Sequence, residues 1–247
     1  MLETISAFWA EYGTVLTDGV WDTLFMVVVS TVFAYLIGVP LGVALIVTQP
    51  QGIRPHRAVY GVLGWIVNIG RSVPFIILMV AIMPFTRMVV GTAIGIKGAI
   101  PPLVISAAPF VARMVETSLS EVDAGVVEAA QSMGASPLQI VRKVYLPEAM
   151  PSLVLGGAIS VVTILAYTAI AGMVGAGGLG SIAIQYGHNR GVTSLMWVTV
   201  VFLIIFVQVV QWIFSGWSRH IDKRLDQTQG AEKTGFFGLF SRFTHTK

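Results

Sequence analysis

The sequence predicts an all-α fold, a polytopic bundle of about five transmembrane helices with a cytoplasmic helix-turn-helix segment. Of the 247 residues, 55% are hydrophobic and only 11% are charged, which is more apolar surface than one soluble core can bury. Uncharged stretches that reach the roughly 20 residues needed to cross a bilayer recur along the chain. One central stretch is polar instead, and it carries the start and stop signals of two short helices.

We place five membrane spans on the uncharged runs of the chain. The expected spans are residues 23–47, 58–85, 100–115, 152–174 and 194–217. Arg71 interrupts the second span. The third contains prolines, which disfavour a straight helix. It also contains two charged residues, which are expected to close the span early and can pair on one helix face. These residues are Pro101, Pro102, Pro109, Arg113 and Glu116.

The distribution of Lys and Arg supports five spans and orients the chain. Basic residues collect in cytoplasmic loops, and with five spans the basic clusters of this chain all fall on one face. They are Arg54, Arg57, Arg113, Arg142, Lys143, Arg219, Lys223, Arg224, Lys233, Arg242 and Lys247. Four spans would place the basic tail on the same side as the acidic N-terminus. We therefore expect the N-terminus outside and the C-terminus in the cytoplasm.

Three parts of the chain follow from this topology. Residues 1–20 are expected to be an external leader, which is retained because it lacks the basic region of a cleavable signal peptide. Residues 21–217 form the membrane domain, which includes a central segment at residues 120–147. Residues 218–247 form a cytoplasmic tail in which phenylalanines and basic residues mix, as suits an anionic membrane surface. An unstructured extension fits the same composition.

The first half of the central segment predicts a helix that a glycine ends. Ser120 can cap its start, with Asp123 three residues later, and Gly134 suits the left-handed residue that closes it. Apolar residues recur there at spacings of three and four, which predicts an apolar stripe. The stripe comprises Val122, Val126, Ala129, Ala130 and Met133.

The second half repeats the start signal. Ser136 is suited to the cap, Pro137 to the first helical position and Gln139 to the closing of a capping box. Pro147 is expected to stop this helix. The residues alone leave two interpretations open, a connector that lies on the membrane surface or an element that docks into a partner's groove.

The spacing of the central segment resembles the EAA loop in permeases of bacterial ATP-binding-cassette importers. Glu128-Ala129-Ala130 is followed at fixed distances by Gly134 and by Val144-Tyr145-Leu146-Pro147, where the family usually has isoleucine at position 144. Stretches that begin at Asn68, Ala108 and Val174 resemble the methionine-importer branch, and the resemblance covers about residues 21–217. It implies that the following residues couple the chain to an ATPase: Glu128, Ala129, Ala130, Gly134, Val144, Leu146 and Pro147.

The resemblance also implies a set of partners and a location. We expect a second copy of the chain, two ATPase subunits, an extracytoplasmic substrate-binding (lipo)protein and the lipids of a bacterial inner membrane. We expect no catalytic residue, metal or cofactor in this chain, because it lacks the phosphate-binding G-x-x-x-x-G-K-[ST] pattern and ATP and Mg²⁺ belong to the ATPase. The implied substrate is D- and L-methionine, with another amino acid or small solute as the alternative.

Other classes fit the sequence less well. A secondary transporter is disfavoured because none of the twelve acids lies within the regular spans. An integral-membrane enzyme is disfavoured because the chain has no H-E-x-x-H pattern and no histidine in a span. A net charge of +3 is too small to indicate nucleic acid. The run Gly175–Gly180 formally fits a dinucleotide fingerprint, but it follows a span rather than a strand, so we expect a turn or close helix packing there.

Five residues are candidates for the translocation path or its gate: Arg71, Ser72, Pro74, Tyr167 and Met173. Arg71 lies roughly 20 Å along a helix that starts at Ala58, hence near the middle of the membrane. It could bind the carboxylate of an amino acid, bond backbone carbonyls freed by Pro74, or pair between two copies of the chain. We favour a structural or gating role, because importers of this class take specificity largely from a separate binding protein. Tyr167 and Met173 fit packing as well as a path.

Overall fold

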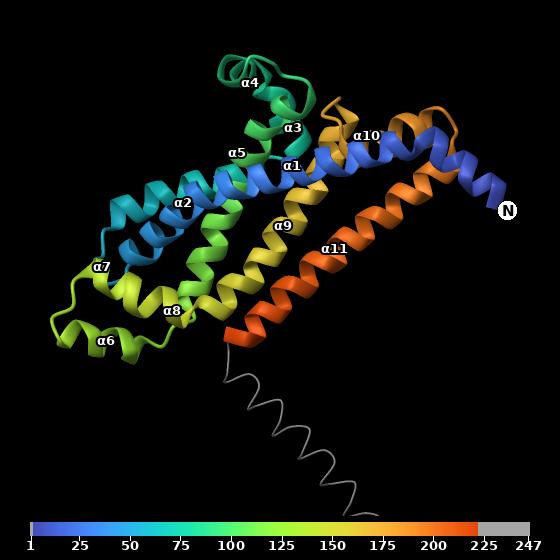
Figure 1. Ribbon diagram of the computed structural model, residues 1–247. Coiled ribbons are helices and arrows are strands. Elements are labelled where there is room, and N and C mark those ends of the chain that lie inside the picture. Colours follow the sequence, from blue (N-terminus) through green and yellow to red (C-terminus); the bar gives the residue numbers. More distant parts are fainter. Residues whose placement is uncertain (1, 222–247) are drawn as a thin grey trace, which may run out of the picture.

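The computed structural model describes residues 2–221, so expectations for the tail from residue 222 onward lie outside the described residues. In this described part the chain is helical with no strand, which confirms the all-α class. Four of its helices are long and apolar enough to cross a membrane, and five spans result when a bent pair is counted as one. Figure 1 shows these helices as a bundle crossed by the long N-terminal helix.

Helix α1 spans Leu2–Thr48 and is much longer than the expected span at residues 23–47. The boundary that we expected after residue 20 is not a helix end, because the leader continues the same helix. Packing explains the extension: Leu16 is buried against Ile182 and Leu195, which lie far along the chain. Figure 1 shows this N-terminal half beside α10 and the start of α11.

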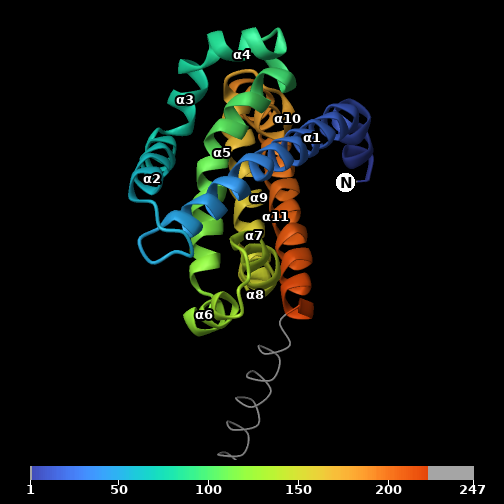
Figure 2. The same ribbon diagram turned by 90° about the vertical axis from the view of Figure 1, so that its left-hand side faces the viewer.

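The expected span over residues 58–85 is not one continuous helix. Helix α2 spans Arg57–Ser72, α3 spans Phe75–Ala81, and the two are bent by 99°. Pro74 causes the break, because it has no N–H to donate and holds Val73 in an extended conformation with ψ 123°. Helix α4, Met83–Val90, follows and ends at Gly91. Figure 2 shows α2 and α3 on one side of α5, with α4 across the end of the bundle where α5 begins.

Helix α5 spans Gly95–Ser120, so the expected limits of residues 100–115 are too narrow. Its three prolines lie inside the helix and do not end it. Most of α5 is buried among α1, α2 and α9, and this packing holds the helix together where prolines remove backbone hydrogen bonds. Arg113 and Glu116 do not end it either, because they form an ion pair along its side.

Helices α9 (Met150–Met173) and α11 (Thr193–Ile221) lie within a few residues of the expected spans at 152–174 and 194–217, apart from the C-terminal end of α11. Between them lie the short helix α10 (Gly178–Ile182) and a π-helical stretch, η2 (Ala183–Asn189). The glycine run forms the turn into α10, where Gly177 has φ +88°. The backbone N–H of Leu179 donates to Thr23 Oγ1 at 2.9 Å, which ties this turn to α1.

The central segment comprises helix α6 (Ala124–Ser132), helix α7 (Pro137–Ile140), a π-helical turn η1 (Val141–Tyr145) and helix α8 (Leu146–Glu148). Helices α6 to α8 lie at the end of the bundle opposite α3, α4 and α10 (Figure 1). The largest hydrophobic cluster joins this segment to α1, α5 and α9. The predicted helix-turn-helix segment is therefore packed onto the membrane helices.

Candidate functional site

The first helix of the central segment starts later than we expected. Its N-cap is Asp123, whose Oδ1 accepts hydrogen bonds from the backbone N–H of Gly125 at 2.8 Å and of Val126 at 3.3 Å. Ser120 instead ends α5, and its hydroxyl donates to the carbonyl of Thr117. Both residues are good caps, and the choice depends on where α5 ends.

The turn and the second start follow the prediction. Gly134 has φ +78°. Ser136 and Gln139 form a reciprocal capping box, in which each side chain accepts from the backbone of the other. The expectation that Pro147 ends the helix is wrong. Pro147 occupies the first turn of α8, where no N–H is needed. The helical path therefore runs on to Glu148.

The central segment has an inner face that packs on the membrane helices. Val127, Ala130, Ile140, Val141 and Tyr145 are buried in the cluster that also contains residues of α1 and α5. Burial raises the pKa of the Tyr145 phenol above its ordinary value. The ring is therefore a neutral packing group, and the segment is held firmly to the bundle.

The outer face of the central segment exposes apolar side chains. Met133 is 81% exposed, Leu138 60% and Val126 45%, and Ala129 beside them is also exposed. The predicted stripe is thus divided, since Ala130 is buried and Val122 packs against the inner cluster, whereas Val126, Ala129 and Met133 are exposed. We call Val126, Ala129, Met133 and Leu138 the outer apolar surface. Apolar side chains gathered at one exposed site are typical of a docking surface.

The residues of the EAA pattern occupy both faces. Glu128, Ala129, Gly134 and Pro147 are exposed, whereas Ala130 is buried. Val144 and Leu146 are partly buried and pack against the same hydrophobic cluster. Nothing lies within 4 Å of a Cβ built on Gly134, so glycine is needed there for its backbone angle and not for space. The pattern therefore builds the turn and its packing as well as an exposed surface.

A polar network joins α2 to α5 above the central segment. Arg113 binds Glu116 at 2.6 Å and donates to Asn68 Oδ1 at 2.7 Å. The Tyr60 hydroxyl donates to the other oxygen of Glu116 at 3.2 Å. The sequence indicated only the Arg113–Glu116 pair; Tyr60 and Asn68 were missed, although both are polar residues on the apolar helix α2.

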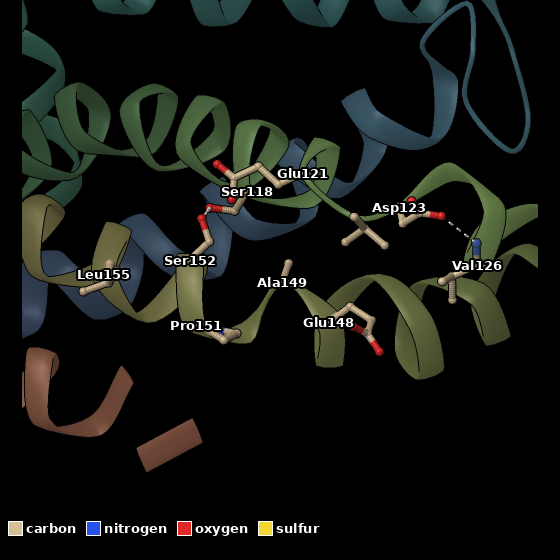
Figure 3. A pocket seen from close by; sticks show the side chains of 10 residues that line it. Ser118, Glu121, Asp123, Val126, Glu148, Ala149, Pro151, Ser152 and Leu155 are labelled. Carbon is tan, nitrogen blue, oxygen red and sulfur yellow. Dashed lines mark hydrogen bonds between the residues drawn. The ribbon is translucent and has the colours of Figure 1, made fainter. Parts of the chain in front are cut away.

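Two adjoining cavities lie between this network and the central segment. The larger, about 470 Å³, is bordered by α5, α6, α8 and α9 (Figure 3). In it the Ser152 hydroxyl donates to the Ser118 hydroxyl at 3.0 Å, near Glu121. The smaller, about 340 Å³, is lined by Arg71 and Arg113. Ser118, Glu121, Ser152 and Leu155 line both cavities, so the two lie side by side.

The candidate path residues fall into separate places. Arg71 is exposed in the last turn of α2, and within residues 2–221 its side chain makes no hydrogen bond or ion pair. The Ser72 hydroxyl donates to Asn68 O, one turn earlier in α2, at 2.7 Å. Tyr167 stacks on Phe75 with ring centroids 4.7 Å apart. Met173 is exposed at the end of α9. Of these five candidates, only Arg71 lines the smaller cavity.

Comparison with known proteins gives consistent results. Residues 38–227 match the family described as binding-protein-dependent transport system inner membrane component. The chain is 49% identical over 221 residues to the probable D-methionine transport system permease protein MetI of Vibrio cholerae, covering 90% of this chain and 98% of that protein. The corresponding protein of Haemophilus influenzae is 43% identical over 213 residues, covering 86% and 100%. A solved inward-facing structure of the MetNI methionine ABC transporter superposes with a TM-score of 0.85 at 47% identity, covering 86% and 99%.

Proposed function

The chain belongs to the family of binding-protein-dependent transport system inner membrane components, and from this premise we propose that it is the permease subunit of an ATP-binding-cassette importer for D- and L-methionine. The observation that supports the substrate is the near full-length likeness to D-methionine permeases, at 49% identity over 98% of one of them. The outer apolar surface of the central segment supports a partner that binds there.

The proposed assembly contains two copies of this chain, two ATPase subunits and an extracytoplasmic substrate-binding (lipo)protein. ATP and Mg²⁺ are used by the ATPase. The N-terminus lies outside and the C-terminus in the cytoplasm, as the positions of the basic residues favour. This orientation puts the central segment on the side where ATP is available.

Coupling follows from the two faces of the central segment. The outer apolar surface binds the ATPase in the helix-in-groove manner. The inner face packs in one cluster with α1, α5 and α9 through side chains such as Val127, Ile140 and Tyr145. Because packed side chains transmit displacement, a movement of the docked ATPase moves these helices. The cavities between α5 and α9 then open or close with it.

Gly134→Asp tests this proposal, with Gly91→Asp as the matched control. Both glycines have positive φ, +78° and +80°, and free space around an added Cβ, so both substitutions carry a similar backbone strain. Asp tolerates this conformation better than most residues, so folding is retained. Only Gly134 lies beside the outer apolar surface, where a charge disfavours docking.

The measurement is ATP-driven methionine uptake into proteoliposomes that contain the chain, its ATPase and its binding protein. We expect Gly134→Asp to reduce both the affinity for the ATPase and the rate of methionine uptake by about tenfold or more. Gly91→Asp should retain both. Uptake of methionine without ATP, or full uptake in Gly134→Asp, would contradict coupling through the central segment. Uptake of another solute with no response to methionine would contradict the substrate.

A further inference from the structure

The smaller cavity has a wall suited to an apolar side chain. Phe110 and Met114 of α5 line it together with Leu155 and Ile159 of α9. Its volume of about 340 Å³ is at the lower end of the range for ligand pockets, which is roughly 300 to 1,000 Å³. A single amino acid is therefore a better match than a larger solute.

Of the two arginines at this cavity, only Arg71 is available to a ligand. Arg113 already binds Glu116 and Asn68, and the acid balances its charge. Arg71 has no hydrogen-bonding or ionic partner among residues 2–221. An arginine within a membrane span is costly unless a partner or water stabilises it, and such residues mark substrate paths. A guanidinium binds a carboxylate through two parallel hydrogen bonds.

The polar network determines where Arg71 lies. Asn68 precedes Arg71 by three residues, so the two share one face of α2. The bond from Arg113 to Asn68 holds this face against α5. The bond from Ser72 to the Asn68 carbonyl closes the last turn before Pro74 bends the chain. Asn68 and Arg113 are therefore positioning residues for Arg71.

We propose that Arg71 binds the carboxylate of the amino acid as it passes through this cavity, with the apolar side chain against Phe110, Met114, Leu155 and Ile159. This inference rests on the proposed function and names the residue at which the permease itself holds its substrate. The shared lining residues Ser118 and Ser152 give the substrate a polar exit into the larger cavity beside the central segment (Figure 3).

Photoaffinity labelling of the importer tests the site directly. The probes are photo-methionine, whose side chain carries a diazirine, and its primary amide, which lacks the carboxylate. Labelled peptides of this chain are quantified by mass spectrometry, so that binding elsewhere in the complex does not contribute. The variants are Arg71→Gln and Arg71→Lys. Arg87→Gln is the matched control, because Arg87 is exposed on α4 and does not line the cavity.

In the unmodified importer we expect photo-methionine to label residues 110–117 or 155–159, and excess methionine to prevent it. Arg71→Gln should reduce this labelling by about tenfold, to the level of the amide, because a charge-assisted pair is lost. Arg71→Lys should restore part of it, and Arg87→Gln should change nothing. ATP-driven methionine uptake should fall in parallel, while the ATPase still copurifies.

Three results would overturn the inference. The first is absence of labelling in these peptides of the unmodified importer. The second is equal labelling in Arg71→Gln. The third is that Arg71→Gln reduces labelling by photo-methionine and labelling by its amide to the same extent, which indicates a structural role for Arg71. In each case normal methionine uptake by the unmodified importer would leave the proposed function intact, whereas failure of that uptake would contradict the proposed function itself.

Discussion

Arg113 on α5 donates a 2.7 Å hydrogen bond to Asn68 on α2 while its guanidinium also binds Glu116 at 2.6 Å. One side chain thus attaches the first half of a bent span to α5, the most buried of the long helices that could cross a membrane. Glu116 is only 6% exposed, and Tyr60 binds its second oxygen. The network therefore fixes the bend at Pro74 relative to the cavity.

The network gives the first prediction. Arg113→Ala should destabilise the protein by about 2 kcal/mol, because Glu116 is left buried with Tyr60 as its remaining partner and because Arg113 itself is partly exposed. Thermal unfolding of the detergent-solubilised protein measures this. Arg87→Ala, an exposed position, serves as the control. The double change Arg113→Leu with Glu116→Leu should recover much of the lost stability. If the double variant is less stable than Arg113→Ala, the destabilisation does not come from the unpaired Glu116 carboxylate.

A second prediction concerns the contact between α1 and α10. Thr23 accepts from the buried N–H of Leu179 at 2.9 Å and donates to Gly19 O. Thr23→Val keeps the shape but leaves that N–H without a partner, which should cost about 1 to 3 kcal/mol. Thr17→Val is the matched control, since Thr17 is exposed and bonds only carbonyls of its own helix. Equal melting temperatures for the two variants would show that the turn at Leu179 does not depend on Thr23.

Local signals predicted the central segment well. Ser136, Pro137 and Gln139 specify a helix start through bonds between near neighbours, and Gly134 supplies a backbone angle that few other residues adopt. The start of α6 was misplaced because Ser120 and Asp123 are both suitable caps. The end of α5 decides between them, and that end depends on packing.

Prolines show where local signals are insufficient. Pro74 is exposed and ends α2, whereas Pro102 is buried and lies inside an unbroken α5. The residue type is the same, and the difference comes from the helices packed around α5. The length of α1 is a similar case, because the partners of Leu16 lie far along the chain. The cavity at Arg71 could not be predicted, since it combines residues of three helices.

The glycines of the turn region give a third prediction. A Cβ on Gly172 would lie 2.4 Å from the backbone nitrogen of Ser181, and backbone cannot move aside as a side chain can. Gly172→Ala should therefore separate α9 from α10 and cost about 1 to 3 kcal/mol as overpacking does. Gly216→Ala, on α11 with nothing within 4 Å, should be neutral or stabilising by up to about 1 kcal/mol. The measurement is the melting temperature of each variant. Equal melting temperatures for Gly172→Ala and Gly216→Ala would mean that α9 and α10 are not in tight contact at Gly172.

The outer apolar surface gives the last prediction. Met133 is 81% exposed, so replacing it cannot disturb the core of this chain, yet docking on the ATPase would bury it. Met133→Gln should therefore weaken ATPase binding by about tenfold, roughly 1.4 kcal/mol, with no change in the melting temperature of the isolated permease. Met88→Gln is the control, because Met88 is 77% exposed on α4 at the opposite end of the bundle. The measurement is the affinity of the ATPase for each immobilised permease variant. A loss of binding in Met88→Gln as large as that in Met133→Gln would place the ATPase contact elsewhere.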